Sequence, residues 1–358
     1  MHFFCKSILS YLCVFSYYDK LMYKTDSMTI IFLNNMVYLI VRPFYNKNEV
    51  FTYMLRYFTK RMITAIFTAF VVATLTFFIM NMVPGGPFLA EKAVTPQAQA
   101  AMEAKYGLDK PLGQQYLTYM NGLVHGDLGI SLKKRGRTVS QIIATKFPVS
   151  ARLGGLAMIL AVFAGIPLGA IAAYRRGKLI DRILVVLSTA GIAIPSFLSS
   201  TLLMYIFTTK LKWLPSLGLN TPKAYIMPVV ALALYPTFYI ARLMRSSMLD
   251  VIGQDYMRTA RAKGVNTFRS IFKHALRNAI LPVITYLGPL LASLMTGSFI
   301  IEKIFNIPGL GSEFVGAITS RDYPMIMGTT IFLAVFVIFM NVIVDILYAI
   351  VDPRIKLK

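Results

Sequence analysis

Charged residues are scarce in this chain, and the residues that build disulfide frameworks or zinc sites are nearly missing. Only 15% of the 358 residues are charged, whereas a soluble domain carries about 25%. The two cysteines, Cys5 and Cys13, lie in the first fourteen positions, and the three histidines are far apart in the sequence. Neither a disulfide framework nor a zinc-ligand spacing can be formed from these residues.

The sequence also lacks the machinery of an enzyme. No phosphate-binding loop of the form Gly-x-x-x-x-Gly-Lys-Ser/Thr occurs, so any ATP that is used must be bound by another chain. A membrane-embedded enzyme would need a nucleophile with a base in reach, or paired carboxylates or metal ligands at membrane depth. Ser298 has no His or Asp spaced to serve it. Arg242 and Asp345 are the ionisable residues expected inside membrane spans, and snorkelling or a structural pair is favoured for them over a proton relay.

Apolar residues make up 56% of the sequence and predict an all-α membrane protein. A transmembrane helix needs about 20 apolar residues. Residues 84–150, between the first two spans, contain polar helical stretches at 97–105 and 114–123, which predict a small cap outside the membrane. Prolines such as Pro195 are expected to interrupt the helices that contain them. The six predicted spans are 62–83, 153–174, 183–208, 225–244, 279–301 and 324–351.

The net charge of +22 is explained by orientation in a bilayer. Nucleic-acid binding would place basic residues on a polar face, but here they lie in short clusters between apolar spans. Lys and Arg are enriched in cytoplasmic loops, and most of these clusters fall on one side. Both termini and the loop 245–278 are therefore predicted to be cytoplasmic, and the cap 84–150 extracytoplasmic.

Residues 1–53 do not fit this plan. Their longest apolar run, 30–41, is too short for a span and is interrupted by two asparagines. We expect this atypical extension to be upstream DNA translated from a misplaced start. Residues 54–61 form a basic lead-in, 62–351 the transmembrane domain and 352–358 a cytoplasmic tail.

A short cytoplasmic helix is predicted from about Asp255 to Lys263. Its first turn is acidic and its last turn basic, and Gly264 can take the left-handed position that ends a helix. Small side chains at Ala260 and Gly264 would let another protein approach the backbone. A basic helix lying on anionic lipid head groups fits the composition equally well. The residues that either role would use are Tyr256, Arg258, Thr259, Ala260, Arg261, Ala262, Lys263 and Gly264.

A second cytoplasmic helix is predicted after Asn266 or Thr267, either of which can cap it. The pair Leu281-Pro282 then begins the next span. Because the residue before a proline resists helical geometry, this junction is predicted to act as a hinge between the loop and the membrane helix.

The run from Tyr256 to Gly264, followed by Arg277-Asn278-Ala279-Ile280-Leu281-Pro282, resembles the coupling loop of ABC importer permeases. Arg258-Thr259-Ala260 stands where many members have Glu-Ala-Ala, and five more residues separate Gly264 from Leu281 than in sugar importers. Both departures are usual in the peptide and nickel branch. Further segments that resemble this branch include Pro84-Gly85-Gly86-Pro87-Phe88, His125-Gly126-Asp127-Leu128-Gly129, Ile307-Pro308-Gly309-Leu310-Gly311 and Arg321-Asp322-Tyr323-Pro324.

The resemblance implies the permease subunit of a bacterial importer for oligopeptides, with permeases for dipeptides or nickel as alternatives. The implied partners are a second homologous permease, two cytoplasmic ATPases that use ATP and Mg²⁺, an extracytoplasmic peptide-binding protein and membrane lipid. No cofactor is expected on this chain. Residues 302–313 contain Pro308, Gly309 and Gly311, which are too irregular for one helix; they predict an external gate, although a plain surface loop fits nearly as well.

Overall fold

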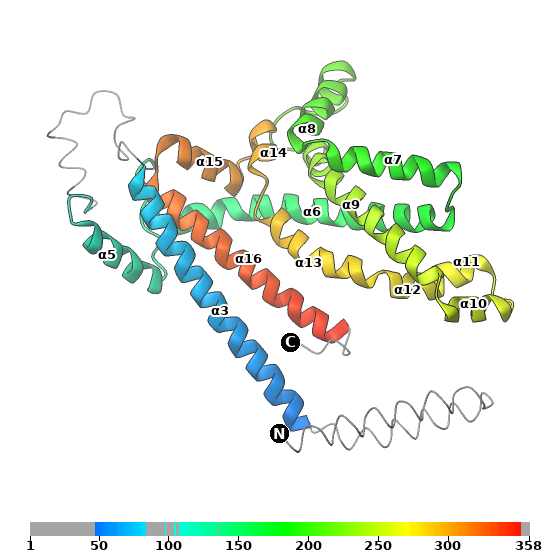
Figure 1. Cartoon of the computed structure of the whole chain (residues 1–358). Helices are drawn as coiled ribbons and strands as arrows, with labels where there is room; N and C mark the ends of the chain where they lie inside the picture. The colour runs from blue at the N-terminus through cyan, green and yellow to red at the C-terminus, as the bar shows by residue number, and fades with distance from the viewer. Residues whose placement is uncertain (1–46, 84–96, 98–103, 105–106, 135, 352–358) are drawn as a thin grey trace. The chain divides into compact units, whose positions relative to one another are not determined.

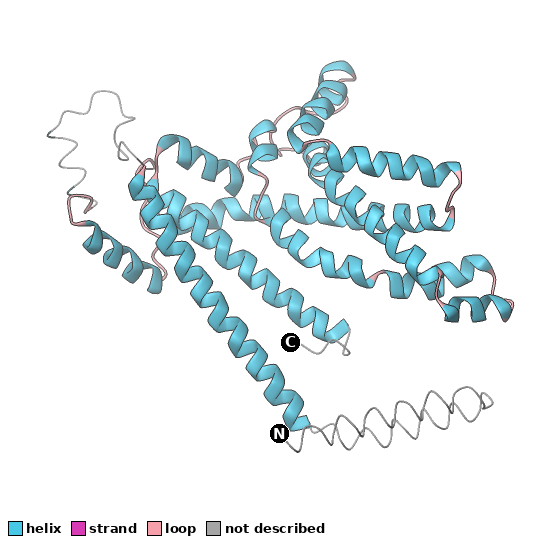
Figure 2. Ribbon diagram, viewed as in Figure 1, coloured by secondary structure: helices cyan, strands magenta, loops and turns pink. Residues whose placement is uncertain are grey.

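The computed structural model describes residues 47–83, 97, 104, 107–134 and 136–351, and the regular elements within these residues are helices (Figure 2). The chain divides into units of residues 1–63 and 64–358. The described part of the first unit is helical and begins α3 (Lys47–Met82), which contains the predicted lead-in 54–61. Most of the predicted extension 1–53 and the tail 352–358 lie outside the described residues.

Among the described residues, five continuous apolar helical segments are long enough to cross a membrane, and each overlaps one of the six predicted spans. Each overlaps a long helix that is labelled in Figure 1: α3, α6 (Val139–Tyr174), α9 (Ile226–Ile252), α13 (Leu281–Met295) or α16 (Tyr323–Val351). The segments themselves are Thr59–Met82, Val139–Tyr174, Pro222–Ile252, Leu281–Ile304 and Tyr323–Val344.

The predicted span at 183–208 is interrupted in its middle. Helix α7 (Leu179–Ala193) is followed by α8 (Ser196–Met204) and a π-helical turn, η2 (Tyr205–Lys210), and the two halves meet at 102°. The break lies at Ile194, which is extended (φ −73°, ψ 121°), and Pro195. Proline has no N–H and disfavours helical geometry in the preceding residue. These halves form either one broken span or a re-entrant loop.

The second span begins earlier than its predicted start at residue 153. Thr138 caps α6: its Oγ accepts from the Gln141 N–H and its own N–H donates to Gln141 Oε1, both at 3.2 Å. Residues 139–150, which we assigned to the cap, are therefore the first turns of α6. Within the cap, α5 (Leu112–Val124) confirms the polar helix at 114–123. Most of 84–106 lies outside the described residues, so the cap as a unit stays a prediction.

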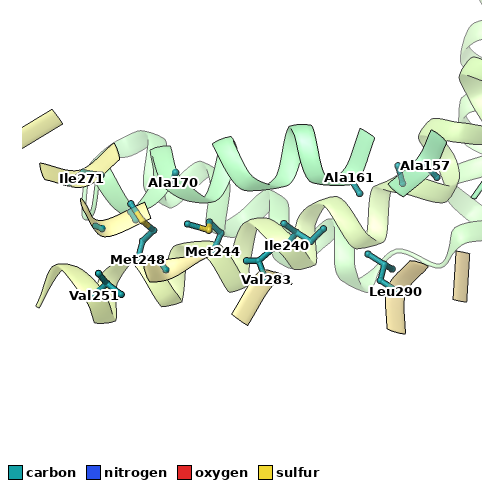
Figure 3. Packing of buried hydrophobic residues seen from close by; sticks show 14 of the residues in the cluster. Ala157, Ala161, Ala170, Ile240, Met244, Met248, Val251, Ile271, Val283 and Leu290 are labelled. Carbon is teal, nitrogen blue, oxygen red and sulfur yellow. The ribbon is translucent and has the colours of Figure 1, made fainter. Parts of the chain in front are cut away.

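The main core forms where α6 packs along α9 (Figure 3). Small side chains such as Ala161 and Ala170 of α6 face Ile240 and Met244 of α9. The approach is closest at Gly169, where a Cβ would lie 2.4 Å from a backbone oxygen of α9. Small residues allow this close packing. Inside a membrane the hydrophobic effect does not drive helices together, so van der Waals packing of this kind stabilises their association.

Short elements extend from both ends of α13. Before it lie α10 (Asp255–Ala262), α11 (Thr267–Arg269), the π-helical η4 (Ser270–Ala275) and α12 (Leu276–Ala279). After it lie α14 (Phe299–Ile304) and α15 (Leu310–Ser320). The predicted docking loop and the predicted gate therefore adjoin opposite ends of the same helix (Figure 1).

Candidate functional site

The short helix predicted from about Asp255 to Lys263 is confirmed as α10, and its docking role stays a prediction. It ends as the sequence predicts, because Gly264 is left-handed (φ +78°) and the Val265 N–H donates to the Ala260 carbonyl at 3.2 Å. Met257 is fully buried in the main core. This anchor holds the opposite face of α10 outward, where Tyr256, Arg258, Thr259, Ala262, Lys263 and Gly264 are exposed and Ala260 is half-buried.

The docking helix is also tied to the segment that leads into the membrane. Asn278 Nδ2 donates to the Tyr256 hydroxyl at 2.8 Å, which joins α10 to α12. Asn266 caps the second helix as expected, since its Oδ1 accepts from the Phe268 N–H at 3.1 Å. That helix is divided into α11, η4 and α12. A displacement of α10 would therefore be transmitted towards α13.

The predicted hinge lies close to its expected place. Helix α12 ends at Ala279, and Ile280 separates it from α13, whose first two residues are Leu281 and Pro282. Ile280 itself keeps near-helical dihedral angles (φ −75°, ψ −18°). The break thus precedes Leu281 by one residue, and motion at this junction stays a prediction.

The predicted gate region is built around a buried carboxyl group that our sequence analysis missed. The Glu302 side chain is fully buried. Its Oε1 accepts from Ser150 Oγ of α6 at 2.6 Å, and its Oε2 accepts from the Ser312 N–H of α15 at 2.8 Å. Ser150 Oγ in turn accepts from the Leu310 N–H at 2.8 Å. Glu302 therefore joins α6, α14 and α15 at one point.

Two of the three predicted gate residues, Gly309 and Gly311, are explained by this carboxyl group. A Cβ on Gly309 would lie 2.5 Å from Glu302 Cδ, and one on Gly311 would lie 3.0 Å from Glu302 Oε2 and 2.9 Å from the Phe299 nitrogen. Gly309 has φ −88°, so the requirement is for space and not for an unusual backbone. Pro308 is exposed. The region is not a plain surface loop, because Phe305 and Leu310 are also buried.

Two further carboxylates that sequence reasoning missed hold loops in place. Asp322 accepts from the Leu132 N–H at 3.1 Å and from Ser131 Oγ, which fixes the segment before α6 to the start of α16. Asp181 accepts from Arg245 Nε at 2.6 Å and from the Gly177 N–H at 2.9 Å. Glu302 lies one residue beyond the span predicted at 279–301. An acidic residue at the end of a span was therefore the signal in the sequence that could have marked it as a candidate functional residue. Asp322 lies in the family-like segment Arg321-Asp322-Tyr323-Pro324, although nothing local indicated its contact with Ser131, and Asp181 has no local signal.

The chain is similar to known transport proteins. Residues 165–357 match the family described as binding-protein-dependent transport system inner membrane component, and residues 54–154 match the model of its N-terminal part.

The dipeptide transport system permease protein DppB of Bacillus subtilis is 48% identical over 304 residues, which cover 85% of this chain and 99% of that protein. The oligopeptide permease proteins OppB of Haemophilus influenzae and Escherichia coli K12 are 44% and 42% identical over 305 residues, or 85% of this chain and 100% of each. A solved chain of the inward-facing MetNI methionine ABC transporter has a TM-score of 0.48 and 16% identity, covering 60% of this chain and 97% of that one.

Proposed function

Because this chain belongs to the family of inner membrane components of binding-protein-dependent transport systems, we propose that it forms one transmembrane half of an oligopeptide importer. The similarity to peptide permeases shows that this chain is a permease subunit of an ABC peptide importer. The permease subunit is not itself an enzyme. The oligopeptide assignment rests on the Pro84-Gly85-Gly86-Pro87-Phe88 motif and the long segment 84–150. Dipeptide transport is the second candidate, because the DppB relative is 48% identical.

The observation that carries the mechanism is the geometry of α10. A helix that lies on lipid would turn its apolar side chains towards the membrane. In α10, the apolar Met257 points into the chain's own core, and the outward face carries small and basic residues. No described atom lies within 4 Å of a Cβ built on Gly264, so the backbone there is open to a partner. These features favour docking of a cytoplasmic ATPase over a lipid anchor.

The proposed complex contains a second homologous permease, two cytoplasmic ATPases and an extracytoplasmic peptide-binding protein, all in a lipid bilayer. ATP and Mg²⁺ are bound by the ATPase chains, and this chain holds no cofactor. ATP-driven movement at α10 passes through the Tyr256–Asn278 hydrogen bond and Ile280 to α13. At the other end of α13, the buried Glu302 side chain and the adjacent Gly309 and Gly311 form the external gate.

Purification tests this function directly. We expect the tagged chain, extracted under mild conditions, to bring down two ATPases and a second permease, and the complex to hydrolyse ATP. The isolated chain should show no ATPase activity, because its sequence has no phosphate-binding loop. Stoichiometric hydrolysis by the isolated chain, or a purified complex without ATPase subunits, would contradict the proposal.

The orientation can be checked with single cysteines at exposed positions. Gln114→Cys on α5 should react with a membrane-impermeant thiol reagent in intact spheroplasts, whereas Arg176→Cys should react only after the membrane is opened, because the basic loop is assigned to the cytoplasm. Both cysteines replace exposed side chains, so both should react once the membrane is opened. The reverse labelling pattern would overturn the assignment of both termini to the cytoplasm. Cys5 and Cys13 must first be replaced by serine.

A further inference from the structure

A cavity of about 490 Å³ lies beside the break between α7 and α8. It is lined by the broken segment, by α9 and α13, and by Ser298 and Ile301 at the start of the gate region. Its volume falls in the range of roughly 300–1,000 Å³ that is usual for small-ligand pockets. Because Ile301 belongs to α14, the cavity lies directly against the helix that carries Glu302.

The lining of this cavity is mainly apolar, but it includes several residues with hydroxyl groups and carries no charge. Tyr235 and Tyr286 contribute phenol groups, and Ser196 and Ser293 contribute hydroxyl groups; no described residue of the lining is acidic or basic. The side-chain hydroxyls of these four residues make no hydrogen bond within the described part of the chain. A hydroxyl group both donates and accepts, so the cavity offers free partners of both kinds.

The broken helix adds acceptors. Residues 192–194 line the cavity, and the carbonyl groups at a helix end have no donor in a following turn. Pro195 has no N–H, so it cannot supply one. Irregular backbone at membrane depth is tolerated where it is buried in protein or lines a water-filled cavity. Here the unpaired backbone borders a cavity with hydroxyl groups on its other walls.

We propose that this cavity binds the main chain of the transported peptide, with its hydroxyl and carbonyl groups pairing to peptide N–H and C=O groups. The inference rests on the proposed import of peptides and adds a recognition site to it. A peptide backbone alternates donors and acceptors, which matches this lining. Because the walls are uncharged, they do not favour peptides with acidic side chains over peptides with basic ones. A transporter that accepts peptides of many sequences requires this property.

Cysteine protection in the assembled importer tests this site. The complete complex carrying Ser293→Cys is reconstituted in vesicles with its binding protein, and alkylation is followed during turnover with Ala-Ala-Ala, Ala-Lys-Ala or Ala-Glu-Ala. We expect each peptide to slow alkylation about fivefold, the effect of a site that is about 80% occupied. Thr319→Cys, an exposed position on α15 away from the cavity, should be unaffected.

Each alternative has its own outcome, and uptake is measured on the same vesicles. Normal uptake without protection of Ser293→Cys would overturn the site and leave the proposed function standing. Absence of uptake in the unsubstituted complex would instead contradict the function. A cysteine that is unreactive with and without peptide would show that the partner permease fills the cavity, which also overturns the proposal.

Removing one hydroxyl group gives an independent test. Tyr286→Phe keeps the ring, which lies 4.4 Å from that of Tyr239, and should therefore preserve packing. We expect about threefold to tenfold slower uptake of all three peptides, the range for one lost hydrogen bond. The control Tyr205→Phe alters an exposed ring outside the cavity and should transport normally. Equal uptake by both variants would rule out pairing at the Tyr286 hydroxyl.

Discussion

Replacing Gly264 by aspartate is expected to abolish peptide uptake while leaving the chain inserted at normal abundance. Gly264 is exposed and left-handed, and a Cβ there meets no described atom of the chain. The substitution costs about 1 kcal/mol of backbone strain, which the fold can tolerate. Against an ATPase surface, however, it adds a side chain and a negative charge at the point of closest approach. The measurements are peptide uptake, membrane abundance and the amount of ATPase that co-purifies.

A second glycine provides a matched control for this experiment. Gly177 has φ +76°, is exposed and also has open space around its Cβ position, but it lies in the loop between α6 and α7. Gly177→Asp thus introduces the same side chain at the same backbone conformation outside the docking helix, and it should retain most uptake. Arg269→Gln, which removes one exposed charge, should do the same. If Gly264→Asp transports normally at equal abundance, α10 is a lipid anchor and not a docking helix.

Replacing Glu302 by alanine is expected to destabilise the gate region by roughly 3–5 kcal/mol, because the change empties a buried site and removes two hydrogen bonds. The Ser150 hydroxyl and the Ser312 N–H would be left without their acceptor. The thermal midpoint of the purified complex should fall on the order of 10 °C. Membrane abundance should fall with it.

The role of Glu302 as a gate requires a milder change. Glu302→Gln keeps the shape of the side chain but presents an N–H₂ group to one of the two donors, so one hydrogen bond is lost and the fold survives. We expect peptide-loaded vesicles with this variant to leak about threefold to tenfold faster. Glu313→Gln is the control on the same segment, since it removes only the partly exposed ion pairs with Lys134 and Lys146. Leakage equal to that of Glu313→Gln would show that Glu302 stabilises the fold without gating.

Local patterns in the sequence were sufficient for α10. The acidic first turn at Asp255, the basic residues that follow and the glycine at 264 act within a few residues of one another, and the helix lies where they indicate. The apolar spans were predictable for the same reason, because each helix satisfies its own backbone hydrogen bonds inside the membrane. An error arose where a local signal was overlooked, as at the Thr138 cap. The interruption at Pro195 was expected, but its bend of 102° was not.

The amino-acid sequence by itself determined the membrane class, most spans, the short helix α10 and the family, because these depend on composition and on contacts between near neighbours. Only the tertiary structure decided that Glu302 meets Ser150, 152 positions earlier in the chain, and that Asp322 meets Ser131. It also gave a different reason for Gly309 and Gly311, which the sequence marks only as irregular. Their small size makes room for a buried carboxyl group, and such a requirement arises only when distant segments pack together.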